Sequence, residues 1–281
     1  LVCLRQKKCK HANNHEKDYM KSALLTGMNG SVAYVMKKEL EHKYDISGIS
    51  ITRMDDVLTE LQPTSWKGQL DAYRDRVTDQ IATACRGKDA LVHLGWNTRD
   101  DNCGSGLDPL NVLQTDCAYR AAIAEKVPRI YMTSSVHSYH FEADIFDRTE
   151  PIPHTPDTRR DPFGAPPSSL YGVSKRWMEI AGQFYEPQLA DGQAILAVRL
   201  GGVSRSEEPP SKEWAYVWDS HRDCAGLLEA FMECEDPPRF SITYGVSANQ
   251  SDDPNEIKFD TSNPYGFVPQ DNAFLDGEGE G

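Results

Sequence analysis

The sequence predicts an α/β fold in which helices cover both faces of one doubly wound parallel sheet. Two observations support this. Short apolar stretches alternate with longer segments of helical periodicity from residue 22 to residue 245. The length of 281 residues suits one large domain of this kind. Steady alternation of strand and helix favours right-handed crossovers, which bury a parallel sheet on both sides.

Each strand is predicted from a brief apolar run, in the order Ser22–Thr26, Ile46–Ile51, Ala90–Leu94, Arg129–Ser134, Ala194–Leu200 and Phe240–Gly245. The helices expected between them are Ser31–His42, Val77–Cys85, Pro109–Lys126, Ser169–Phe184 and Asp219–Glu233. Residues 1–19 are polar and basic, and residues 273–281 are acidic and rich in glycine, so both ends are expected to be tails. A single domain is therefore placed at residues 20–272.

The composition argues against several classes of protein. A net charge of −13 makes general binding of nucleic acid unlikely, because a surface that follows phosphates needs an excess of basic residues. The sequence has no run of about 18 apolar residues, so no helix is expected to cross a membrane. The seven cysteines are scattered and form no C-x-x-C pair, which indicates reduced thiols in a cytoplasmic protein.

A glycine-containing loop follows the first predicted strand directly. It reads Thr26-Gly-Met-Asn-Gly-Ser-Val-Ala33 and leads into a helix. The first glycine permits a tight turn, the second lets the backbone approach a pyrophosphate, and the helix start supplies free N–H groups. A turn that needs glycine only for its backbone angles is the alternative. The loop predicts a Rossmann-type dinucleotide site with contacts from Gly27, Asn29, Gly30, Ser31 and Val32.

The end of the second predicted strand bears on the choice of dinucleotide. This position usually holds an acid that binds the adenosine ribose, and here the sequence reads Ser50-Ile-Thr-Arg53. Arg53 could meet a 2′-phosphate, which favours NADP slightly over NAD. The alternative is that Arg53 is only a solvated loop residue.

The motif Tyr171-Gly-Val-Ser-Lys175 begins a predicted helix. Residues four apart share a helix face, so the phenol and the ammonium point the same way. A nearby ammonium lowers the pKa of a phenol, which is about 10 in isolation. Such a phenol can take a proton from a substrate hydroxyl while hydride leaves the carbon. Ser135, just past the fourth predicted strand, could hold the same substrate oxygen.

With these motifs, residues 20–272 resemble the extended short-chain dehydrogenase/reductase family, also called the NAD-dependent epimerase/dehydratase family. The resemblance implies that Ser135, Tyr171 and Lys175 form the catalytic triad. It also implies that Leu70 and Asp71 contact the adenine, and that Leu94, Gly95 and Trp96 line the dinucleotide site. Asn111 would lie in the helix behind the triad and contact the dinucleotide. Tyr171 and Lys175 would contact it as well, with Lys175 on its ribose. Members of the family commonly pair through two helices, so a homodimer is expected.

Within that family the chain is most similar to uronate dehydrogenases and archaeal sugar and sugar-phosphate dehydrogenases. Four stretches carry the similarity: Ser134–His137, Pro167–Lys175, Trp218–Asp223 and the pair Tyr244–Asn249 with Tyr265–Asn272. These enzymes oxidise the C1 hemiacetal of a cyclic sugar to a lactone. The resemblance implies substrate contacts from Thr98, Val136, His137 and Lys212.

Two departures widen the range of expected sugars. Val136 stands where uronate dehydrogenases have asparagine, and Lys212 lies in the region that otherwise holds an arginine for the sugar carboxylate. A neutral aldose or a phosphorylated sugar is therefore as well supported as a uronate. Residues 138–168 form a long connection that we expect to cover the sugar. No metal site is predicted, because Asp144, His154 and Asp157 fit no ligand spacing.

Together these features predict an NAD(P)-dependent sugar dehydrogenase with a small C-terminal region over the substrate. Two alternatives remain open at this point. One is a nucleotide-sugar epimerase or dehydratase, although the C-terminal region leaves little room for a nucleotide base. The other is a non-catalytic protein that senses the dinucleotide, although both Tyr171 and Lys175 are present.

Overall fold

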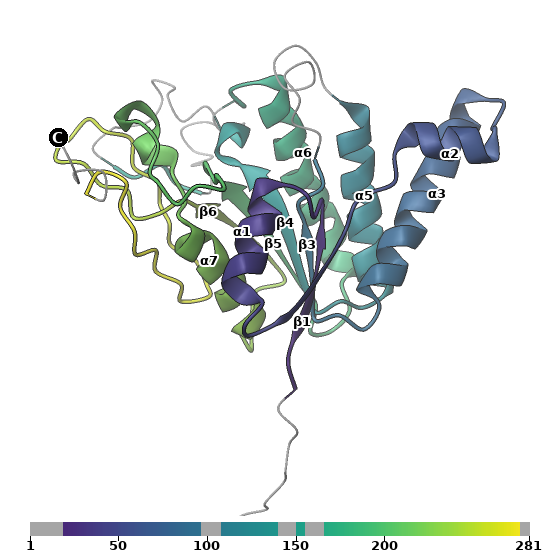
Figure 1. Cartoon of the computed structure of the whole chain (residues 1–281), viewed down its shortest axis with the longest axis horizontal. Coiled ribbons are helices and arrows are strands. Elements are labelled where there is room, and N and C mark those ends of the chain that lie inside the picture. The colour runs from purple at the N-terminus through teal and green to yellow at the C-terminus, as the bar shows by residue number, and fades with distance from the viewer. Residues whose placement is uncertain (1–18, 97–107, 140–149, 155–165, 276–281) are drawn as a thin grey trace, which may run out of the picture.

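Six parallel strands form one sheet in the order β2-β1-β3-β4-β5-β6, with helices on both faces (Figure 1). The computed structural model describes residues 19–96, 108–139, 150–154 and 166–275. The strand order reverses between β1 and β3, where a chain that first extends the sheet one way returns to extend it the other way. The predicted doubly wound parallel α/β fold is therefore confirmed.

The strands lie close to their predicted positions. They are β1 (Ser22–Thr26), β2 (Asp45–Ile49), β3 (Ala90–His93), β4 (Arg129–Ser135), β5 (Ala194–Leu200) and β6 (Phe240–Gly245). All residues of β1, β3 and β5 are buried, which explains why these strands are continuous apolar runs rather than alternating ones. The register pairs Ser135 with Leu200, so β4 and β5 end side by side.

The helices differ more from the prediction. They are α1 (Ser31–Leu40), α2 (Met54–Leu61), α3 (Trp66–Cys85), α5 (Pro109–Ala124), α6 (Leu170–Tyr185) and α7 (His221–Glu233), with short 3₁₀ turns at Val136–Ser138, Glu186–Gln188 and Lys212–Val217. Helix α3 begins at Trp66 rather than at Val77, and α2 was not predicted. The first part of α3 is polar and rests on the Ser65 cap and on ion pairs from Asp71 to Lys67 and Arg74. Such contacts leave no apolar period in the sequence.

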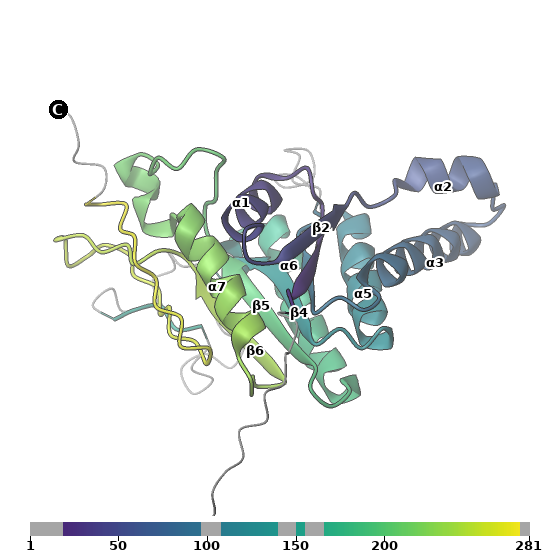
Figure 2. The same ribbon diagram turned by 60° about the horizontal axis from the view of Figure 1, so that its bottom comes forward.

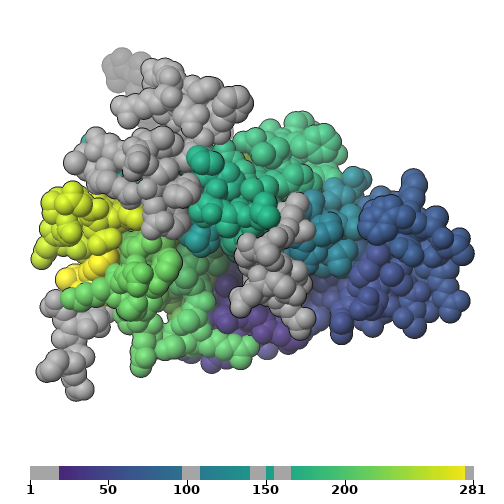
Figure 3. All heavy atoms as spheres, turned by 90° about the horizontal axis from the view of Figure 1, so that it is seen from above, coloured from purple at the N-terminus to yellow at the C-terminus, as the bar shows by residue number. Residues whose placement is uncertain are grey.

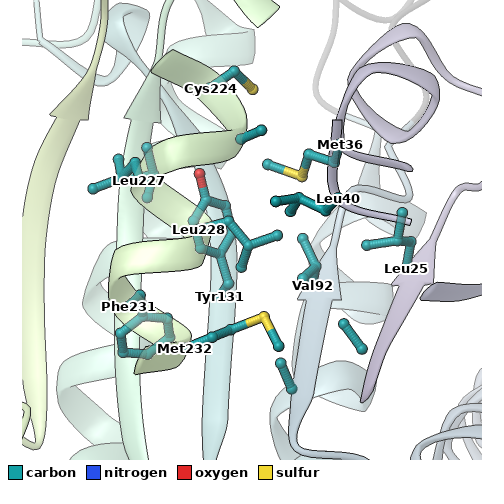
Figure 4. Packing of buried hydrophobic residues seen from close by; sticks show 14 of the residues in the cluster. Leu25, Met36, Leu40, Val92, Tyr131, Cys224, Leu227, Leu228, Phe231 and Met232 are labelled. Carbon is teal, nitrogen blue, oxygen red and sulfur yellow. The ribbon is translucent and has the colours of Figure 1, made fainter. Parts of the chain in front are cut away.

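Two apolar layers enclose the sheet. Helices α1 and α7 pack on one face, and Figure 4 shows Met36 and Leu40 of α1 meeting Leu228 of α7 above Tyr131 of the sheet. Helices α3, α5 and α6 cover the other face (Figure 2). The fold thereby fixes the amino ends of α1 and α6 near the same edge of the sheet, above the carboxyl ends of the strands.

The C-terminal part of the chain after β6 runs mostly as loops along one side of the molecule. In a view from above it lies opposite the projecting α2–α3 pair (Figure 3). Ile152 forms an isolated parallel bridge with Phe259, and both belong to a separate apolar cluster with Tyr244 and Val246. This cluster ties the 150–154 stretch and the C-terminal loops to the end of the sheet.

Within the described residues, no helix is both long enough and apolar enough to cross a membrane. Four described cysteines are free thiols: Cys85, Cys117, Cys224 and Cys234. Burial raises the pKa of the Cys85 and Cys117 thiols to about 11, so both are protonated at neutral pH.

Candidate active site

A cavity of about 870 Å³ opens beyond the carboxyl ends of β1, β3, β4 and β5. Parallel α/β sheets bind ligands at this edge, near the point where the strand order reverses. Its lining includes backbone from the glycine loop and side chains from α6. The lining residues are Gly27, Gly30–Ala33, Leu94, Trp96, Thr133–His137, Tyr171, Lys175, Leu200–Ser204, Glu208, Pro210, Trp214, Val217 and Trp218.

The glycine loop has the geometry of a phosphate site. Gly27 has a φ of +69°, and a Cβ on it would lie 2.8 Å from the Gly95 Cα atom, so glycine is required there. Gly30 is the N-cap of α1 and offers no side chain to the first-turn N–H groups. These groups and the positive end of the helix dipole therefore face the cavity, where a pyrophosphate would satisfy them.

Hydrogen bonds of Thr26 and His93 fix the start of the loop after β3. The Thr26 hydroxyl accepts from the backbone N–H groups of Leu94 and Gly95, both at 3.0 Å. It therefore donates its own proton to His93 Nδ1, also at 3.0 Å. Burial, helped by the charge of Lys175, lowers the pKa of His93 to about 3, so this ring is neutral.

Helix α6 carries Tyr171 and Lys175, the pair for which a catalytic role was predicted. Ser169 caps it by accepting from the Gly172 N–H at 3.1 Å, and the helix then presents Tyr171 and Lys175 to the cavity. The buried Lys175 ammonium donates to the Thr133 carbonyl at 2.6 Å. Its Nζ also lies 3.7 Å from the centre of the Trp96 ring and 5.6 Å from that of Tyr171. The ammonium is thus held between β4, the loop after β3 and the phenol.

Ser135 is the last residue of β4, and its hydroxyl accepts from the His137 N–H at 3.2 Å. The His137 ring lies 6.1 Å from the Tyr171 ring, and its Nδ1 is 2.8 Å from the Ser168 hydroxyl. Helix α6 packs directly against this turn at Gly172. A Cβ there would lie only 2.0 Å from the His137 carbonyl oxygen, so no larger residue fits. Ser135, His137, Tyr171 and Lys175 therefore meet at one wall of the cavity.

A buried ion pair supports this wall from behind. Glu179, two turns along α6 from Tyr171, accepts two hydrogen bonds from Arg199 of β5 at 2.9 and 2.8 Å. The same carboxylate accepts from Ser134 and Ser138 on either side of Ser135. Arg199 and the serine hydroxyls hold the pKa of Glu179 below its usual value despite burial. The network joins α6, β4 and β5 at the height of the catalytic groups.

Other predicted site residues lie apart from the cavity lining. Asn29 donates to the Ser50 hydroxyl, Arg53 is exposed with its guanidinium 3.7 Å from Asp55, and Gly95 packs on the loop of Gly27. Leu70 and Asp71 lie on α3, Asn111 is buried near the start of α5, and Lys212 is exposed at the start of a 3₁₀ turn. Thr98 lies outside the described residues. The roles assigned to these residues stay predictions.

The wall of the cavity that begins at the end of β5 was not predicted from the sequence. This wall begins at the last residue of β5 and runs from Leu200 to Ser204. Glu208, Pro210 and Trp214 continue it. The signal available in the sequence was the pair Gly201-Gly202 after a buried strand. The structure explains the first glycine, because a Cβ on Gly201 would lie 2.0 Å from the Val217 carbonyl oxygen. Trp96 was expected through the resemblance, but its position over Lys175 was not.

Comparison with known proteins agrees with this site. A NAD-dependent glucose-6-phosphate dehydrogenase from Haloferax volcanii is 29% identical over 257 residues, which cover 89% of this chain and 93% of the relative. An L-arabinose 1-dehydrogenase (NAD(P)(+)) from the same organism is 26% identical over 89% of this chain and 96% of that protein. The chain is a homologue of NAD-dependent sugar dehydrogenases. The predicted resemblance and the predicted class of NAD(P)-dependent oxidoreductase are confirmed.

The fold comparison points the same way. The solved structure of a mutated uronate dehydrogenase superposes with a TM-score of 0.65 at 22% identity and covers 92% of this chain and 84% of that one. Models of known protein families give no match to the sequence. This likeness shows that the chain has the same Rossmann-type fold as that structure.

Proposed function

We propose that the chain oxidises the C1 hemiacetal of a cyclic sugar to a lactone and passes the hydride to a nicotinamide dinucleotide. The observation that carries this proposal is the convergence of Ser135, Tyr171 and Lys175 on a cavity that also contains an open helix start. The names of the two curated relatives, both sugar dehydrogenases, support the substrate class.

The glycine loop fits a dinucleotide, because the first-turn N–H groups of α1 lack a side-chain cap and line the cavity. Gly27, Gly30, Ser31 and Val32 would hold the pyrophosphate, and Leu94 would contact the rest of the dinucleotide. When bound, the nicotinamide supplies the hydride acceptor. Arg53 favours NADP in this proposal, whereas the first curated relative is named NAD-dependent.

The chain's own residues carry the proton. The Ser135 hydroxyl holds the anomeric oxygen of the sugar, and the Tyr171 phenolate removes its proton. The Lys175 ammonium stabilises the phenolate electrostatically from the same helix face. Trp96 covers one side of this ammonium and separates it from solvent.

The charges of the described lining favour a neutral aldose over a uronate. Lys175 is the one Lys or Arg among those lining residues, and its ammonium already donates to the Thr133 carbonyl beside Tyr171. Glu208 also lines the cavity and would repel a sugar carboxylate. Lys212, the expected replacement for the carboxylate-binding arginine, is exposed and outside the lining.

A panel assay tests the proposed function. Reduction of NAD and of NADP is followed by absorbance with L-arabinose, D-xylose, D-glucose, glucose 6-phosphate, glucuronate and galacturonate. We expect a rate with at least one neutral aldose and acidification as the lactone hydrolyses. Turnover of glucuronate alone would contradict the assignment to a neutral aldose. Absence of any rate from a chain that binds the dinucleotide would contradict the dehydrogenase assignment.

We also propose a homodimer that forms through α6. The outer face of this helix carries the exposed apolar side chains of Val173, Ile180 and Phe184, the last of which is 67% exposed. We expect Phe184→Glu to convert the dimer to a monomer in analytical ultracentrifugation. Val268→Glu changes an equally exposed apolar residue elsewhere and should leave the dimer intact. A monomeric parent chain would contradict the proposal.

A further inference from the structure

The segment of residues 203–210, which follows β5, crosses from the cavity to the outer side of α1. Ser204, Glu208 and Pro210 line the cavity. Arg205 donates to the Asn29 carbonyl at 2.9 Å, and its guanidinium lies 5.2 Å from the centre of the Tyr34 ring. The segment is thus attached to the glycine loop and to the first turn of α1.

His221, the first residue of α7, lies beneath this segment and is 95% buried, with a relative exposure of 5%. Its Nε2 is 2.9 Å from the Ser204 carbonyl oxygen. A carbonyl oxygen can only accept, so Nε2 carries a proton, and in the tautomer with one proton the lone pair is on Nδ1. That Nδ1 atom is buried without a hydrogen-bond partner, and it points toward Glu207 Oε1 at 3.3 Å.

Two carboxylates flank this lone pair. Glu39 of α1 and Glu207 of the 203–210 segment each place an oxygen near His221 Nδ1, and the three atoms all lie within 4.8 Å of one another. A neutral imidazole nitrogen and two carboxylate oxygens are all acceptors, so their closeness is unfavourable unless a positive charge lies among them. Lys38 supplies such a charge at the edge, because its ammonium pairs with Glu207 and lies 3.7 Å from Glu39.

We propose that Glu39, Glu207 and His221 bind a divalent transition-metal ion such as Zn²⁺. One imidazole nitrogen and two carboxylate oxygens are ligands that zinc accepts, with water completing a tetrahedral site. The hydrogen bond from Nε2 to a backbone carbonyl is the support that metal-binding histidines usually have. Distances of about 2.0–2.2 Å to a central ion require the two glutamate side chains to draw closer to His221. The Glu207 side chain is 63% exposed, so solvent surrounds much of it.

A metal at this position joins three parts of the molecule. Glu39 belongs to α1, Glu207 to the 203–210 segment and His221 to α7. The ion would therefore fasten the 203–210 segment to the two helices that pack together on one face of the sheet. Since the segment lines the cavity, the metal would hold one wall of the cavity against α1 and α7.

Lys38 and the metal compete for the same carboxylates. In the absence of metal, the ammonium on Glu207 partly neutralises the cluster. A bound ion takes over that role and displaces the ammonium, which lies on a side chain that is 45% exposed and free to move away. Removal of the Lys38 charge should therefore tighten metal binding, whereas removal of a carboxylate should weaken it.

Titration calorimetry of the untagged full chain with ZnCl₂, without dinucleotide, tests the site directly and independently of the proposed function. We expect Glu39→Gln and Glu207→Gln to lose one equivalent of bound zinc or to bind it about tenfold or more weakly. Lys38→Met should bind it more tightly than the parent. Glu41→Gln is the matched control and should bind as the parent does. Glu41 is the C-cap of α1, and among the described residues its ion pair is with Lys37.

Visible absorption of bound Co²⁺ provides a second readout of the same site. The parent chain should give ligand-field bands that Glu39→Gln and His221→Asn lack, while circular dichroism shows that both variants are folded. Identical zinc stoichiometry and affinity in the parent, Glu39→Gln and Glu207→Gln would overturn the proposal. The same conclusion would follow if Lys38→Met weakened binding.

Limited trypsin digestion tests the effect on the 203–210 segment. Zinc should slow cleavage after the exposed Arg205 in the parent and in Glu41→Gln. It should not slow this cleavage in Glu39→Gln, which also controls for any effect of zinc on trypsin. Equal protection in Glu39→Gln and in the parent would contradict a metal that fastens this segment.

Discussion

Helices α1 and α6 both begin at the cavity, yet they contribute to it in opposite ways. The α1 start has no side-chain cap and exposes backbone N–H groups, whereas the α6 start is capped by Ser169 and contributes the side chains of Tyr171 and Lys175. Backbone groups need only glycine and a turn to be in place. Side chains need support, which α6 obtains from the Glu179–Arg199 pair. In the proposed function, α1 therefore binds the dinucleotide and α6 carries out the chemistry on the sugar.

The sharpest test of this separation is Tyr171→Phe. Loss of the phenol should lower kcat by about 10²–10⁴-fold, because general base catalysis by this group is removed. The dissociation constant for the dinucleotide should stay within about threefold of the parent, since the proposed function places the pyrophosphate at the start of α1. Steady-state assays and fluorescence titration measure the two quantities. Tyr19→Phe, which removes a phenol outside the cavity, is the control.

The support of α6 is tested by Arg199→Met. The change leaves the Glu179 carboxylate buried without its guanidinium, which should lower the free energy of unfolding by about 3–5 kcal/mol in urea titration. The double variant Glu179→Leu/Arg199→Met removes both charges and should recover much of this loss. A single variant within about 1 kcal/mol of the parent would show that the pair does not hold the wall.

The role of the glycine loop before α1 is tested by comparing two glycines with nearly the same positive φ angle. Gly27 and Gly87 have φ angles of +69° and +71°, but only a Cβ on Gly27 meets backbone within 4 Å. Gly87→Ala should cost about 1 kcal/mol of unfolding free energy and leave dinucleotide binding unchanged. Gly27→Ala should cost about 2–3 kcal/mol and abolish that binding in calorimetry. Equal effects of the two changes would remove the special role of the glycine loop.

The smallest effect concerns His93, whose pKa is lowered to about 3 by burial and by Lys175. An unfolded histidine has a pKa of about 6.5, so only the unfolded chain takes up this proton between pH 6.5 and 3. The stability is present above pH 6.5 and is lost as the pH falls. From pH 7 to 5 we expect a loss of about 2 kcal/mol. His93→Asn should lack this part of the pH dependence in urea titrations, and an unchanged slope would contradict the assignment.

The sheet and the shared helix face of Tyr171 and Lys175 were predictable because their signals are local. Apolar runs mark the buried strands, and the spacing of Tyr171 and Lys175 alone places them on one face. The wall formed after β5 was not predictable, because it depends on contacts between Gly201 and Val217 that only the folded chain brings together. The position of Trp96 over Lys175 and the closeness of His221 to Glu39 likewise arise from tertiary packing.

The contact between Gly172 and the His137 carbonyl oxygen determines which positions of this enzyme can be redesigned. Any larger residue at 172 would push α6 away from the strand that ends at Ser135. The hydroxyls of Ser135 and Tyr171 would then no longer reach the same oxygen atom of the proposed sugar. The next residue, Val173, faces outward and can vary without moving either hydroxyl. Libraries for new sugars should therefore keep residue 172 fixed and diversify the wall after β5, where substrate fit can change without altering proton transfer.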